Sequence, residues 1–162
     1  AMYYALGEAQ FARGDVAAGV SLMQRALDQA GNDAHARMRA LIGVGLAMNK
    51  VGRLDDSNAR YDEARDWYAQ HPTLDRALRE QVDYLNAVNL ISQNHKDQAR
   101  ALLVALVDGY KARGAEFDDA VIEASSMYVY LLGAMKQPDQ ALAVSAQMYG
   151  QAKAQPQLAL AR

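Results

Sequence analysis

The stretch NKVGRLDDSNARY, residues 49–61, has the residue order of a corner between two antiparallel helices. Gly52 is expected to close the first helix, because glycine adopts the left-handed backbone conformation of a helix C-terminus at low cost. The acidic pair that begins at Asp55 is expected at the start of the second helix, where carboxylates cap free amides and favour the positive end of the helix. The small residue Ser57 then allows the two helices to approach, and Tyr61 enters the core.

The same order recurs three times along the chain. The recurrences are FARGDVAAGVSLM (residues 11–23), ISQNHKDQARALL (91–103) and GAMKQPDQALAVS (133–145). The four turn residues are Gly14, Gly52, Asn94 and Lys136, at spacings of 38, 42 and 42 residues, and the small residues after them are Gly19, Ser57, Ala99 and Ala141. Lysine is poorly suited to the left-handed conformation, so we expect the fourth turn to close differently, with Pro138 starting the next helix.

Apolar residues at helical spacing lie on both sides of each turn, whereas alternation typical of strands is nowhere sustained. The expected helices are 2–13, 16–30, 33–51, 54–70, 74–93, 96–113, 117–135 and 138–154. The sequence therefore predicts an all-α fold, an α-solenoid of four antiparallel helix pairs. We expect a single domain over 1–162 with repeats at 2–31, 33–70, 73–114 and 116–154. Residues 155–162 would begin a further or capping helix, and the chain reads as part of a longer protein.

Two of the repeats resemble a known family. Tyr3, Leu6, Gly7, Gln10, Gly19, Met23 and Ala26 of the first repeat, and Leu41, Val44, Gly45, Met48, Ser57, Tyr61 and Ala64 of the second, stand where the tetratricopeptide repeat (TPR) places its Trp, Leu, Gly, Tyr, Ala, Phe and Ala. The later repeats depart from this pattern, with Ala87 and Val129 at the first glycine position. Their long spacing is similar to that of repeats in bacterial signalling and transcription regulators and in kinesin light chains. The resemblance implies a right-handed superhelix with a concave binding surface.

The resemblance also implies which residues face that surface. These are Tyr4, Glu8 and Phe11; Arg39, Ile42, Leu46 and Asn49; Tyr84, Val88 and Ile91; and Glu123, Met127 and Tyr130. Packing between neighbouring repeats is the alternative role for the apolar members. Arg39, Glu8, Asn49 and Tyr130 are the preferred functional residues of this set. The expected partner is a peptide or a protein segment.

The charged clamp by which some family members hold a partner's C-terminal carboxylate is not expected here. That clamp needs Lys and Asn in the first helix, Asn in the second, and Lys and Arg in the third. The matching positions hold Tyr4, Glu8, Gly43, Gln81 and Leu85.

Composition and spacing give no support to catalytic or metal chemistry. The chain has no cysteine, and its three histidines, His35, His71 and His95, are far apart and are expected to be solvated. We therefore expect no enzyme, no metal site and no cofactor. A net charge of -2 gives no reason to expect nucleic acid, and the longest apolar run, ALLVALV (101–107), is too short to enter a membrane as a span. A cytoplasmic location is expected, with the periplasm left open.

Two alternatives to a peptide-binding scaffold remain. The repeats could form a sensory or regulatory segment of a larger bacterial regulator, binding a small effector or docking on a neighbouring domain. They could also associate with one another through the terminal repeats, because neither end of the sequence shows an obvious polar cap.

Overall fold

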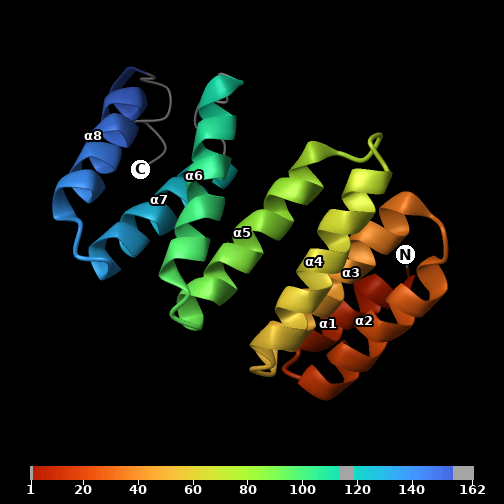
Figure 1. Cartoon of the computed structure of the whole chain (residues 1–162). Helices are drawn as coiled ribbons and strands as arrows, with labels where there is room; N and C mark the ends of the chain where they lie inside the picture. The colour runs from red at the N-terminus through yellow and green to blue at the C-terminus, as the bar shows by residue number, and fades with distance from the viewer. Residues whose placement is uncertain (1, 114–118, 155–162) are drawn as a thin grey trace. The chain divides into compact units, whose positions relative to one another are not determined.

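The computed structural model describes residues 2–113 and 119–154, with side chains described as far as residue 148. Within these residues the chain forms eight α-helices (Figure 1): α1 Met2–Ala12, α2 Val16–Ala30, α3 Ala34–Lys50, α4 Leu54–Gln70, α5 Arg76–Ser92, α6 Lys96–Ala112, α7 Asp119–Ala134 and α8 Pro138–Ala154. The predicted all-α repeat arrangement is confirmed, with each helix close to its expected bounds. Residues 155–162, expected to begin a further helix, lie outside the described residues.

All four predicted turn residues adopt the left-handed conformation. Their φ angles are 83° at Gly14, 76° at Gly52, 63° at Asn94 and 58° at Lys136. In each turn the following amide donates to a carbonyl five residues earlier, at 2.8–2.9 Å: Asp15 to Gln10, Arg53 to Met48, His95 to Leu90 and Gln137 to Leu132. The expectation that the fourth turn closes differently is therefore wrong. This hydrogen-bonded closure imposes the left-handed conformation on the turn residue whatever its side chain.

Helix starts differ from the expectation in one respect. The side chains of Asp15 and Asp33 cap α2 and α3, accepting hydrogen bonds from the amides of Ala18 and Ala36 at 3.1 and 2.9 Å. Asp55, expected to cap, instead lies inside the first turn of α4, as Asp97 does in α6, and the cap residues there, Arg53 and His95, make no side-chain cap bond. The acids in these first turns still favour the positive helix end.

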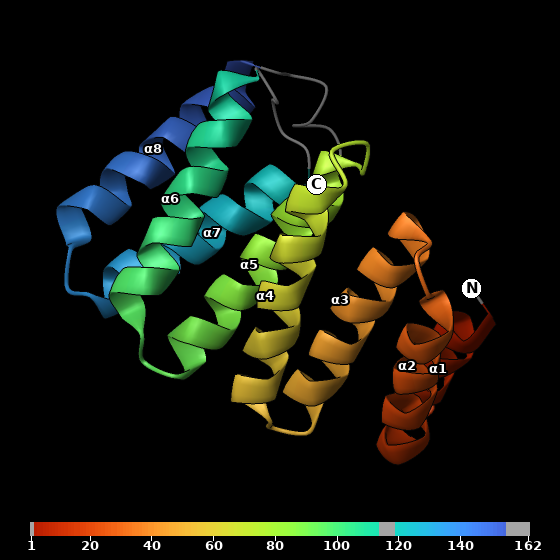
Figure 2. The same cartoon turned by 45° about the vertical axis from the view of Figure 1, so that its right-hand side comes forward.

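The chain divides into two compact parts, Ala1–Asn89 and Leu90–Arg162. In the first part, α3 lies between α2 and α4 and packs against both (Figure 2). In the second part, α7 packs against both α6 and α8. In each part, the first helix of one repeat therefore packs on the second helix of the repeat before it.

Glycines in α3 allow close approach in the first part. A Cβ atom on Gly43 would lie 2.8 Å from both Met23 Sδ and Tyr4 Cε2, and a Cβ atom on Gly45 would overlap the Tyr61 ring. Tyr61 is fully buried, and this burial raises the pKa of its hydroxyl to about 12, against a smaller lowering by a hydrogen bond with Ser57. The aromatic rings of α1 and α4 thus rest directly on the α3 backbone.

The core of the second part is built mainly from α6 and α7. Its buried apolar residues are Ala99, Leu103, Leu106, Val107 and Tyr110 from α6, and Ala124, Leu131 and Leu132 from α7. Lys96 Nζ donates to the Ala134 carbonyl at 3.0 Å, and Arg100 donates to the Gln140 side chain at 3.1 Å. These bonds tie α6 to the repeat that follows it.

Candidate partner-binding site

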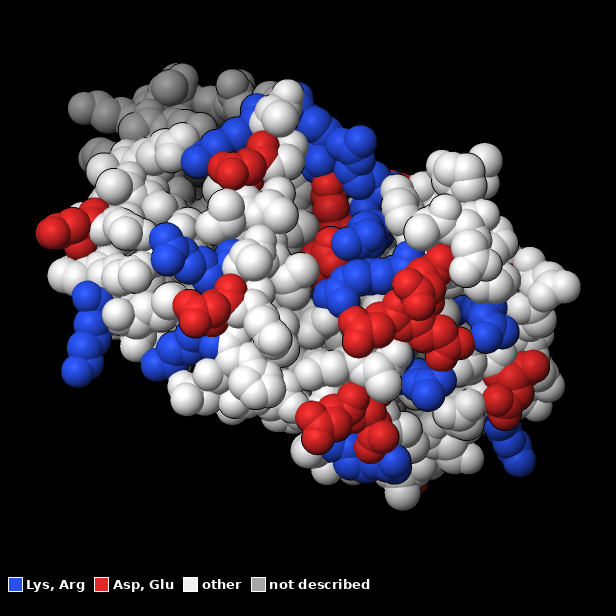
Figure 3. All heavy atoms as spheres, in the orientation of Figure 1, with Lys and Arg blue, Asp and Glu red and all other residues white. Residues whose placement is uncertain are grey.

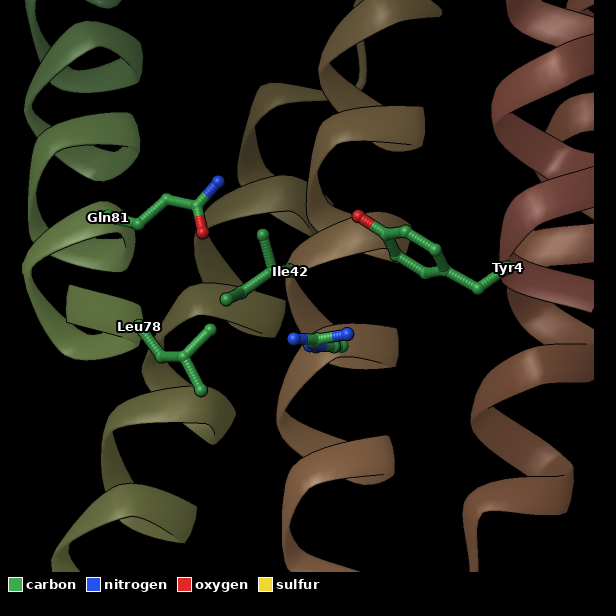
Figure 4. A pocket seen from close by; sticks show the side chains of 5 residues that line it. Tyr4, Ile42, Leu78 and Gln81 are labelled. Atoms are coloured by element: carbon green, nitrogen blue, oxygen red, sulfur yellow. The ribbon is translucent and has the colours of Figure 1, made fainter. Parts of the chain in front are cut away.

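A pocket with a volume of about 290 Å³ opens on the face formed by the first helices of the first three repeats. It is lined by Tyr4 of α1, by Arg39 and Ile42 of α3, and by Leu78 and Gln81 of α5. Figure 4 shows the Tyr4 hydroxyl directed inward from one side, Leu78 and Gln81 reaching in from the other, and Ile42 between them. All five residues belong to the first compact part.

The walls of this pocket carry charge beside apolar surface. Burial raises the pKa of Tyr4, the charge of Glu8 and a hydrogen bond with its carboxylate raise it further, and Arg39 lowers it. The Tyr4 hydroxyl is therefore a neutral hydrogen-bonding group. Among the described residues Arg39 forms no ion pair, so its exposed guanidinium is available to an anion.

The structure brings together part of the predicted groove. Tyr4, Glu8, Arg39 and Ile42 gather at the pocket, because the small residue Gly43 lets the Tyr4 ring lie on α3. Leu78 and Gln81 were absent from the predicted set. In the sequence, Gln81 was considered only as a position of the charged clamp. Leu78 lies one helical turn before Gln81 on α5, and this spacing was the one sequence feature that could have identified it as a pocket residue.

Other predicted groove residues do not line this pocket. The Phe11 ring packs where a Cβ on Gly19 would fall, with Lys50 Nζ 5.7 Å from its centroid. Leu46, Tyr84 and Val88 are half-buried, and only Leu46 of α3 is among the residues that pack against the core of the first part. Ile91, Glu123, Met127 and Tyr130 belong to the second compact part, where Glu123 and Tyr130 are exposed and the other two are half-buried.

Asn49 is engaged in a hydrogen-bonded network between the second and third repeats. Its Nδ2 donates to Asn89 Oδ1 at 2.5 Å, and Asn89 Nδ2 donates to Ser57 Oγ at 2.8 Å and to Asn58 Oδ1 at 3.0 Å. Ser57 Oγ in turn donates to the Gly45 carbonyl at 2.7 Å. Ser57 and Asn89 are fully buried, so these bonds satisfy polar groups that have no access to water. We call these four side chains the amide network.

Asn49→Ala should destabilise the fold, because it leaves the buried Asn89 oxygen without a donor. We expect a loss of about 1–3 kcal/mol in the free energy of unfolding, measured by urea titration followed by circular dichroism. Gln29→Ala, an exposed change on α2, is the matched control and should stay within about 0.5 kcal/mol of the parent. If Asn49→Ala lost no more stability than that control, the hydrogen bond to Asn89 would not stabilise the fold. The Asn49 side chain would then again be a candidate for partner binding.

The outer face of α4 carries a second polar cluster. Figure 3 shows acidic and basic side chains interleaved there. Arg37 forms an ion pair with Glu63 at 2.9 Å. The Asp83 carboxylate pairs with both Arg65 and Arg79, whose Nε atoms lie 2.8 and 2.9 Å from its two oxygens. The opposite charges of these pairs largely neutralise one another.

His71 differs from the solvated histidine expected. Its ring stacks on Trp67 with centroids 3.9 Å apart, and it is half-buried. Trp67 donates its indole hydrogen to the Ala34 carbonyl at 3.0 Å and lies 4.9 Å from the Arg37 guanidinium. The stack closes the ends of α3 and α4 against each other, so these rings have a packing role. His35 and His95 are exposed, as expected.

In residues 2–113 and 119–154, no three histidine, aspartate or glutamate side chains gather closely enough to hold a metal ion. None of the helices described there has the length and apolar character needed to cross a bilayer. No model of a known protein family matches the sequence, and no curated protein matches it either.

Proposed function

We propose that this chain is a non-catalytic TPR-like interaction module that binds a peptide or an extended protein segment across α1, α3 and α5. The observation that carries the proposal is the pocket lined by Tyr4, Arg39, Ile42, Leu78 and Gln81. It lies on first helices, the elements that the resemblance to TPR proteins assigns to partner binding. Rigid helices hold its residues, which is the support that a specific binding site requires.

The size of the pocket favours a peptide side chain over a free effector. Small-molecule sites usually enclose about 300–1,000 Å³ and bury most of the ligand. At about 290 Å³ this pocket is at the lower limit of that range. It accommodates one anchoring side chain, while the rest of a peptide would lie along the exposed helix faces.

The chemistry of the pocket favours an acidic residue next to an apolar one. The Arg39 guanidinium can bind a carboxylate through two parallel hydrogen bonds. The half-buried Leu78 offers apolar surface beside it, while Ile42 lines the pocket but is only 2% exposed, and Gln81 supplies an amide for the peptide backbone. We therefore expect an Asp or Glu flanked by a Leu, Ile or aromatic residue in the bound segment.

Selection of a random peptide phage library on the immobilised chain tests this function. Enriched peptides should carry the acidic–apolar pair, and a synthetic copy should bind the parent chain in a fluorescence anisotropy titration. Arg39→Glu should weaken binding at least about tenfold, equivalent to about 1.4 kcal/mol, because it replaces attraction by repulsion. Tyr4→Ala should weaken it by a similar factor.

Arg13→Glu provides the matched control, since Arg13 is an exposed arginine near the end of α1 that does not line the pocket. It should leave the affinity unchanged. Enriched peptides that bind the Arg39→Glu and Tyr4→Ala variants as tightly as the parent would contradict the site. A library that yields no enriched peptide would contradict the function itself.

A further inference from the structure

The Tyr4 ring is held in place by the backbone of α3. A Cβ atom on Gly43 would lie 2.8 Å from Tyr4 Cε2 and 3.2 Å from Tyr4 Cδ2, so any side chain at position 43 would have to displace the ring. The ring is half-buried, and its hydroxyl points into the pocket (Figure 4). The close contact with α3 therefore fixes where the phenol oxygen stands in the pocket.

The proton of the Tyr4 hydroxyl is already used within the chain. Glu8 follows Tyr4 by one helical turn on α1, so the two side chains are neighbours on one helix face. The hydroxyl forms a hydrogen bond with the Glu8 carboxylate. A carboxylate has no hydrogen to give, so the tyrosine is the donor in this bond. Because a phenol carries one proton, the Tyr4 oxygen can act in the pocket only as an acceptor.

The polar groups that line the pocket therefore differ in what they can bind. The Arg39 guanidinium only donates, the Tyr4 oxygen only accepts, and the Gln81 amide can do either. A carboxylate in the pocket satisfies Arg39 but offers Tyr4 nothing except further acceptor oxygens. Leaving the phenol oxygen opposite another acceptor costs free energy, because it loses the hydrogen bond that water would donate to it. A ligand that fits all of these groups carries a donor as well as an anion.

We propose that the pocket selects a hydrogen-bond donor next to the acidic residue of the bound segment, with the Tyr4 oxygen as its acceptor. Glu8 is the positioning residue that fixes the direction of the Tyr4 hydroxyl. Tyr4 and Leu78 reach into the pocket from opposite sides (Figure 4), so the donor and the apolar residue flank the acid on opposite sides. This inference rests on the proposed function and narrows its partner to an Asp or Glu with Ser, Thr or Asn on one side and an apolar residue on the other.

Three versions of one peptide enriched in the phage selection test this inference by anisotropy titration. They differ only in the residue next to the acid, on the side away from the apolar residue, which is threonine, O-methylthreonine or valine. Threonine can donate, O-methylthreonine can only accept, and valine can do neither. On the parent chain the threonine peptide should bind about three- to tenfold more tightly than the other two, which is the scale of one net hydrogen bond.

Two variants separate the roles of the two residues on α1. Tyr4→Phe removes the acceptor, so the three peptides should bind it with similar affinity. Glu8→Ala leaves the Tyr4 hydroxyl free to donate, so the O-methylthreonine peptide should now bind about as tightly as the threonine peptide. A purely structural role of Glu8 would lower all three affinities together and would keep their order. Asp28→Ala removes an exposed carboxylate from α2 that does not line the pocket, and as the control it should behave like the parent.

The failure of this inference can be told apart from the failure of the proposed function. Equal affinities of the threonine and valine peptides for the parent chain overturn the inference, and the proposed function still stands if Arg39→Glu weakens the binding of both. An unchanged order of affinities in Glu8→Ala overturns the inference as well. A library that yields no enriched peptide overturns the inference together with the proposed function.

Discussion

Tyr61→Ala is expected to lower the free energy of unfolding by about 3–5 kcal/mol. The ring is only 1% exposed and rests on the α3 backbone at Gly45, where a Cβ atom would overlap it. Removing it leaves a cavity between α3 and α4, and neither helix can close that cavity without breaking its contacts with the rest of the first part. A loss of this size is a large share of the stability of a small domain.

Chemical denaturation followed by circular dichroism measures this loss, with hydrogen exchange of the α3 and α4 amides as a second readout. Tyr130→Ala is the matched control, because it removes the same side chain from an exposed position and should cost less than about 0.5 kcal/mol. Equal losses for the two variants would show that Tyr61 does not hold α3 against α4.

Leu106→Ala is expected to cost about 2–5 kcal/mol in the second compact part. Leu106 lies on α6 among the buried residues Leu103, Val107 and Tyr110. Its removal takes apolar surface out of the core on which α7 packs. Because the chain has two compact parts, the loss should appear most directly in the opening of α6 and α7.

Hydrogen exchange resolved by residue tests this effect, with protection lost in α6 and α7 and unchanged in α1–α3. Leu142→Ala, studied in dilute solution, is the control, since it removes an exposed leucine from the same part. A change below about 0.5 kcal/mol for Leu106→Ala would contradict its assignment to the core.

The fold could be predicted from the sequence because each corner is specified locally. Turn residue, small residue and apolar spacing all lie within a short stretch, and the four turns share one backbone hydrogen-bond pattern. The prediction for the fourth turn was wrong because it relied on the low propensity of lysine for the left-handed conformation. The shared backbone hydrogen bonds outweigh that propensity at Lys136. The error about Asp55 arose because carboxylates occur both at caps and in first turns, and sequence alone does not separate the two.

The candidate site was predicted only in part. Tyr4, Arg39 and Ile42 were implied by the resemblance to TPR proteins, because they stand at the groove-facing positions of the first two repeats. The position of Leu78 in the pocket depends on how α5 packs against the earlier helices, and this tertiary packing cannot be read from the sequence of α5 alone. Asn49 shows a second limit of sequence-based prediction. The sequence does not tell whether a polar side chain near a helix end faces a partner or, as Asn49 does, donates a hydrogen bond to a buried amide.

The amide network also restricts the order in which these repeats can be joined. Asn89 finds its acceptors in Ser57 and Asn58, and the residues at those places in the first repeat are Gly19 and Val20. A shuffled gene that placed the third repeat directly after the first would bury the Asn89 amide against hydrogen and alkyl groups, with no acceptor. The repeats are alike in backbone but are not interchangeable modules, so recombination within such a chain would be tolerated only at junctions that keep Asn89 opposite Ser57.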